Sequence, residues 1–142
     1  MKSQYSPILI VIISSLCYHL SQKSTPSALH PIAALIVTYA CALVISIISF
    51  FIFVPGTNLI ESIRVANWTS ILLGFAVVGV ELGFLLSYKS GWNISVTSLL
   101  SNTSVALLLI PIGLLLYKEK ISFTTISGVV LCMAGLILIS RS

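Results

Sequence analysis

The sequence predicts an all-α protein, a polytopic membrane bundle of five transmembrane helices. The first observation behind this prediction is composition: of the 142 residues, 58% are hydrophobic and only 7% are charged. A soluble domain carries about 25% charged residues. The second observation is a mean hydropathy of +1.15. Such a chain cannot cover a globule with polar groups in water, but in lipid its outward surface can be apolar.

The third observation is the length of the apolar stretches, because a helix needs about 20 apolar residues to cross the hydrocarbon layer. Short breaks separate these stretches, among them Pro55-Gly56 and Lys89-Ser90-Gly91. The predicted spans are residues 7–22, 31–54, 68–88, 93–117 and 122–140. Together they make one transmembrane domain over residues 1–142. The charged segment 57–67 is expected at the membrane interface.

The first predicted span is the weakest, because its strongly apolar run covers only residues 8–13. A signal peptide is the alternative interpretation. The segment is preceded by one cation, however, and no small-x-small cleavage site follows it. We therefore expect a helix that stays in the membrane.

The cations orient the bundle only weakly. Since successive spans alternate in direction, four of the seven Lys and Arg residues fall on one side of the membrane and three on the other. The positive-inside rule then leaves two arrangements open. Either the N-terminus is cytoplasmic, or the chain inserts in both orientations.

Several classes of function are not expected. The cations are isolated and form no stripe for nucleic acid. Cys17, Cys41 and Cys132 lie inside apolar stretches, without disulfide or metal-ligand spacing. The sequence contains no HExxH, no GxSxG and no carboxylate pair. We therefore expect no metal, no cofactor and no enzymatic activity.

The third predicted span contains Glu81, the only acidic residue deep in a span. An ionisable group at membrane depth is a functional candidate by default. In helical projection Glu81 shares a face with Gly74 and Tyr88, at seven-residue spacing. The opposite face carries small residues, which allow another helix to approach closely: Ala76, Gly79 and Gly83. We therefore expect neighbours on both sides of this helix.

The fourth predicted span is divided in polarity. Its first half, residues 93–104, contains seven Ser, Thr and Asn side chains after Asn93, and its second half is apolar around Pro111. Hydroxyl groups can donate back to their own helix. Alternatively, they line a wet cavity, because polar side chains in a span usually face an interior or water. We favour the cavity, since seven polar residues exceed ordinary scatter.

The depths of these residues predict one shared substrate site. Glu81 lies about 10 Å inside its end of the membrane, and Ser98 and Asn102 return from that end to a similar level. The first span ends on the same side, although a lone histidine near a helix end is more often interfacial than functional. The predicted substrate-binding residues are Tyr18, His19, Glu81, Tyr88, Ser98 and Asn102.

Residues 98–140 carry a family resemblance. A polar-to-apolar helix is followed by a tight turn with Glu119 and then by Gly128 and Gly135 at heptad spacing. This order resembles the end of an EamA-like half in the drug/metabolite transporter superfamily, and also the last two helices of the small multidrug resistance family. Residues 79–95 are similar to single-half members. The multidrug family has a glutamate in its first helix and this chain has none, so no role transfers to Glu81.

The resemblance implies half of a ten-span transporter, with Gly128 and Gly135 at a dimer interface. We expect a half-size secondary transporter for a small metabolite or drug-like molecule in the lipid bilayer of the cell membrane. It would act as a homodimer, antiparallel if both orientations occur, or as a heterodimer with a second half. The alternative is a non-transporting membrane subunit that pairs with or regulates another membrane protein.

Overall fold

The computed structural model describes residues 5–116, 118 and 122–140, and within them it contains helices and no strand. The helices are α1 (Ser6–Ser24), α2 (Pro31–Phe53), α3 (Leu59–Arg64), α4 (Trp68–Lys89), α5 (Ile94–Leu116) and α6 (Phe123–Ser140). Each predicted span is a helix whose ends lie within two residues of the prediction. The all-α fold class is confirmed. The turn predicted at residues 118–120 falls largely outside the described residues, of which only Lys118 is included.

The starts of the helices are fixed by local chemistry. His30 precedes α2, and its Nδ1 accepts a hydrogen bond from the Ile32 amide at 3.3 Å, while Pro31 occupies the first turn. Asn67 caps α4 in the same way, since its Oδ1 accepts from the Thr69 amide at 3.0 Å. The two long helices of this part of the chain therefore begin at residues with capping side chains.

Helix α3 was not predicted as a helix. Asn58 caps it, because its Oδ1 accepts from the Ile60 amide at 3.0 Å. Glu61 lies in its first turn and Arg64 in its last, which matches the helix dipole at both ends. The positive φ of Gly56, +82°, allows the chain to turn out of α2 before α3 begins.

Three of the described helices are long and apolar enough to cross a membrane: α2, α4 and α5. Only 6%, 11% and 6% of their most apolar windows are buried within the chain. Helix α6 contains a shorter apolar stretch, Ile126–Gly135. The protein is thus an all-α membrane bundle, and the count of five spans remains a prediction.

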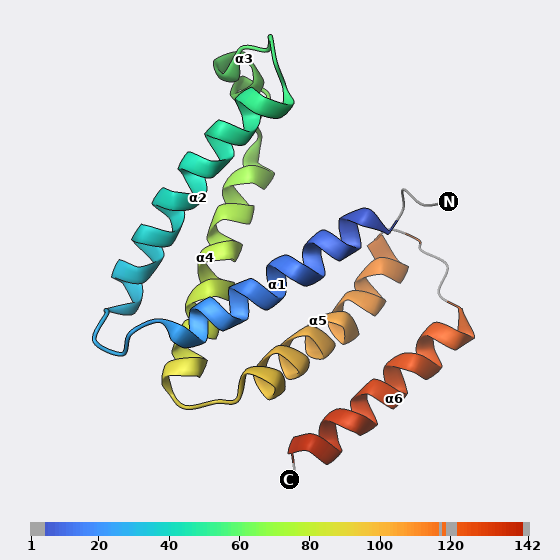
Figure 1. Cartoon of the computed structure of the whole chain (residues 1–142). Coiled ribbons are helices and arrows are strands. Elements are labelled where there is room, and N and C mark those ends of the chain that lie inside the picture. The colour runs from blue at the N-terminus through green and yellow to red at the C-terminus, as the bar shows by residue number, and fades with distance from the viewer. Residues whose placement is uncertain (1–4, 117, 119–121, 141–142) are drawn as a thin grey trace. The chain divides into compact units, whose positions relative to one another are not determined.

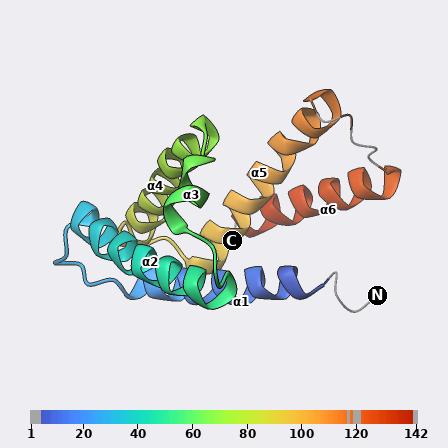
Figure 2. The ribbon, with the colours of Figure 1, turned by 90° about the horizontal axis from the view of Figure 1, so that it is seen from above.

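The chain divides into two compact units. Residues Ser21–Ser90 form one unit, in which α2 packs along α4 (Figure 1). Helix α3 lies at the end of this helical hairpin, where α2 leads into α4. The other unit contains Met1–Leu20 and Gly91–Ser142, and in it α5 packs along α6 (Figure 2).

The buried hydrophobic core within the described residues is small. It consists of Ala34, Leu35, Leu85 and Tyr88. The small-residue face of α4 contacts no other helix of the unit Ser21–Ser90, because a Cβ added at Gly79 or Gly83 would meet no atom within 4 Å. The expectation of neighbours on both sides of α4 therefore stays a prediction. Most of the apolar surface is left for lipid or for another protein, since a bilayer removes the need to bury it.

Candidate functional site

The buried face of α4 is a short stripe near its C-terminal end. Glu81, Leu85 and Tyr88 are the buried residues of this helix, with 6%, 1% and 4% of their surface exposed. Their spacing of four and three residues places them on one side of a helix. Gly74, which the helical projection places on the same face, lies among the exposed residues. Glu81 and Tyr88 therefore lie on one buried face over the last two turns of α4, and their part in substrate binding stays a prediction.

The last turn of α1 docks against this stripe. Gln22, only 9% exposed, donates from its Nε2 to the Glu81 carbonyl oxygen at 3.4 Å. Lys23 donates from its Nζ to the Tyr88 carbonyl oxygen at 3.4 Å. The same ammonium lies 5.9 Å from the centroid of the Tyr88 ring, within reach of a cation–π interaction. Two consecutive α1 residues thus contact α4 at both ends of the stripe.

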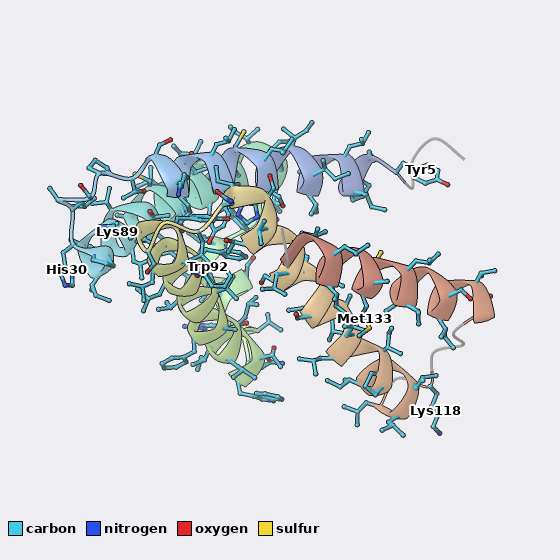
Figure 3. The ribbon with its side chains drawn as sticks, turned by 90° about the horizontal axis from the view of Figure 1, so that it is seen from below. Tyr5, His30, Lys89, Trp92, Lys118 and Met133 are labelled. Carbon is cyan, nitrogen blue, oxygen red and sulfur yellow. The ribbon has the colours of Figure 1, made fainter. Side chains whose placement is uncertain are left out.

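Lys89, the last residue of α4, contacts the loop that precedes α2. Its Nζ donates to the Ser27 carbonyl oxygen at 3.3 Å and also to that of Leu29, in the loop before α2. In Figure 3, Lys89 lies at the same end of this unit as His30. Together Lys23 and Lys89 place two cations at the C-terminal end of α4, which the helix dipole favours. The Lys89 ammonium group thus contacts the loop and not Glu81.

The carboxylate of Glu81 differs from these neighbours. Within residues 5–116, 118 and 122–140, no hydrogen bond or ion pair joins this carboxylate to another side chain or to the backbone. The residue is only 6% exposed, but its carboxylate oxygens are not fully enclosed. An ionisable group in a membrane span usually marks a functional position. The stacked rings of Phe84 and Tyr88, with centroids 6.0 Å apart, lie on the same helix over the following two turns.

Two hydroxyl groups in the polar half of α5 donate to carbonyl oxygens of their own chain segment. Thr97, 7% exposed, donates to the Asn93 carbonyl oxygen at 2.8 Å. Ser98 donates to the Ser95 carbonyl oxygen at 3.2 Å, and Asn102 is exposed. These two bonds match the alternative in which hydroxyls bond back to their own helix. The wet cavity along α5 remains a prediction.

The two remaining residues of the predicted substrate site, Tyr18 and His19, lie on α1. The rings of Tyr18 and His19 meet edge to face with centroids 5.2 Å apart, and both residues are half-buried. They belong, with Ser98 and Asn102, to the unit that does not contain Glu81 and Tyr88. A single site formed by all six residues therefore stays a prediction.

The two glycines predicted at a dimer interface are in α6, and each has room for a partner. A Cβ added at Gly128 or Gly135 would meet no atom within 4 Å. This space is what close approach of a second helix requires. Their part in a dimer also remains a prediction.

Sequence reasoning missed the contribution of Gln22 and Lys23. The available signal was their position, since an amide and a cation occupy the last turn of an otherwise apolar span. The predicted span ends at residue 22, so Lys23 falls just outside it. The structure instead places both side chains on the backbone of α4.

The fold and the buried carboxylate define a class, the multi-pass membrane proteins with an ionisable group inside a span. The EamA-like transporter family matches the chain over residues 4–141, nearly its whole length. The chain belongs to this family, within the drug/metabolite transporter superfamily, and the predicted resemblance is confirmed. No curated protein and no solved structure matches the chain.

Proposed function

We propose that this chain is a half-size secondary transporter that acts as a dimer. Its substrate is a small metabolite or drug-like molecule. The Glu81–Tyr88 face of α4 belongs to the substrate path. The observation that supports this proposal best is the buried Glu81 carboxylate, which has no partner among the described residues. A titratable group held in this way can exchange a proton or a substrate cation for its missing partner.

The proposal of a dimer is supported by the low burial of the long helices. The most apolar windows of α2, α4 and α5 are at most 11% buried, which leaves most of their surface for further helices. Transporter folds generally place their substrate between two repeats near the middle of the membrane. A second copy, or a second half from another chain, would supply the missing repeat.

Transport in liposomes tests the proposal. Purified protein is first screened against a substrate panel by thermal shift, because a bound ligand raises the melting temperature by mass action. The ligands that are found are then followed across proteoliposomes between pH 5 and pH 9. We expect pH-dependent uptake by the wild type and uptake at the level of empty liposomes for Glu81→Gln.

Glu61→Gln is the matched control, because Glu61 is an exposed carboxylate on α3. It should keep the pH dependence of wild-type transport, because the Glu61 carboxylate lies outside the Glu81–Tyr88 face. Normal pH-dependent transport by Glu81→Gln would contradict the assigned site. A folded wild-type protein that binds and moves no member of the panel would favour the alternative, a membrane subunit that pairs with another protein.

A further inference from the structure

A groove runs between α2 and α4, along the half of α4 that follows α3. Its volume is about 1190 Å³, and all of its lining residues belong to the unit Ser21–Ser90. Small-molecule sites usually have volumes of about 300–1,000 Å³ and enclose their ligand. This groove is larger and open at the side, since Leu43 and Phe75 on its walls are 62% and 74% exposed.

The chemistry of the walls favours a hydrocarbon occupant. Among the described residues that line the groove, hydroxyl groups come from Tyr39, Ser46 and Ser70, and none of these lining residues is charged. The Ser46 hydroxyl already donates to the Ala42 carbonyl oxygen at 2.7 Å. A polar ligand would thus find few groups to orient it. Because α2 and α4 are both apolar enough to span a membrane, the groove opens to lipid.

The charges next to the groove indicate which lipid would bind. Helix α3 directly precedes α4 and carries one anion, Glu61, and one cation, Arg64, both exposed. Residues three apart on a helix lie on one face, with about 5–6 Å between their Cβ atoms. Guanidinium groups bind phosphate in a bidentate manner, and a carboxylate accepts hydrogen bonds from a primary ammonium group. A headgroup with both a phosphate and a primary ammonium complements this pair.

We propose that the chain binds a phosphatidylethanolamine-type phospholipid at this position. One acyl chain lies in the groove between α2 and α4, and the headgroup lies on α3. There Arg64 pairs with the phosphate and Glu61 accepts hydrogen bonds from the ammonium group. The site is separate from the buried stripe at the other end of α4, and it would tie α3 to the membrane surface.

The test uses three lipids with identical acyl chains, added to the purified full-length protein in detergent: phosphatidylethanolamine, phosphatidylcholine and phosphatidylglycerol. Apparent affinity is measured from lipid-dependent thermal shifts and from lipid adducts in native mass spectrometry. We expect phosphatidylethanolamine to bind best. Glu61→Gln should lower the affinity for phosphatidylethanolamine about fivefold, to that for phosphatidylcholine. A change of this size is the effect of roughly one charge at the interface. Arg64→Gln should weaken all three lipids.

The acyl-chain part of the site has its own pair of variants. A Cβ added at Gly74, which lines the groove, or at Gly79, which does not, would meet no atom within 4 Å. Gly74→Leu fills the groove and should weaken all three lipids, whereas Gly79→Leu should bind them as the wild type does. Equal affinity of the wild type for the three headgroups would overturn the proposal, and so would equal effects of the two leucines.

A third outcome concerns a second copy of the chain. If Gly74→Leu shifts the protein from dimer to monomer and leaves lipid binding unchanged, the groove is a helix–helix interface and the lipid proposal is wrong. Should Gly74→Leu fail to fold, the comparison of wild type with Glu61→Gln still decides, because it changes only an exposed side chain.

Discussion

The second half of α4 and the first half of α5 are both polar for helices of a membrane protein, but they satisfy their polar groups in different ways. In α5 the hydroxyls of Thr97 and Ser98 donate to carbonyls of their own helix. In α4 the Glu81 carboxylate has no partner among the described residues, and α1 holds the backbone around it. The number of polar residues in a helix therefore does not by itself locate a functional site. The polar group that its own helix cannot satisfy is the better indicator.

Replacing Glu81 by leucine should give the largest effect. If the carboxylate is retained for function, its removal should stabilise the fold, because full burial of an unpaired polar group costs about 1–3 kcal/mol and the Glu81 oxygens, which are not fully enclosed, bear part of that cost. We therefore expect Glu81→Leu to raise the free energy of unfolding by a similar amount and to abolish transport, a trade of activity for stability. Denaturant titration in detergent and liposome uptake measure the two effects.

The opposite result would identify Glu81 as a structural residue. A protonated glutamate that hydrogen-bonds a neighbouring helix would make both Glu81→Leu and Glu81→Ala less stable than the wild type. Glu81→Gln would then keep normal transport. Thr97→Leu on α5 is a useful control, since Thr97 is similarly buried, and it should show no gain in stability.

The contacts of α1 with α4 should give the next largest effect. Lys23→Met removes the hydrogen bond to the Tyr88 carbonyl and the cation over its ring. Together these contacts are worth about 1–2 kcal/mol. We expect the free energy of unfolding to fall by that amount, and by about 1 kcal/mol for Gln22→Leu. Ser21→Ala on the same turn is exposed and should change nothing measurable. Unchanged stability in both variants would mean that α1 does not hold the stripe.

The glycines of α6 extend the comparison to the unit that contains α5. Gly128→Leu or Gly135→Leu fills the open space at these positions. If this face packs against a second copy, each change should weaken dimerisation about fivefold, since interhelical packing terms in membranes are of order 1 kcal/mol. Single-molecule pull-down in detergent measures the dimer. Unchanged dimerisation with both leucines would show that the glycines serve another contact.

The sequence predicted the helices well and the site only in part. Apolar length and the Pro and Gly breaks located the helix ends, because a bilayer imposes a fixed span and every backbone group must be bonded. Glu81 was found for the same reason, as the only carboxylate at depth. Gln22 and Lys23 were missed because their partners are backbone carbonyls of a distant segment. Sequence spacing carries no signal for such contacts.

Thr97→Val should give the smallest effect. Valine keeps the branched shape and removes only the hydroxyl, which donates to the Asn93 carbonyl oxygen at 2.8 Å. That carbonyl also accepts from the Thr97 amide at 3.0 Å, so the substitution leaves no acceptor unsatisfied. We expect a change below about 0.5 kcal/mol in the free energy of unfolding, and unaltered transport. Ser98→Ala should behave alike, because its hydroxyl also donates to its own helix. If either variant lost substrate binding while remaining folded, the hydroxyls of α5 would line the substrate path. The polar groups of α4 and α5 would then not differ in function.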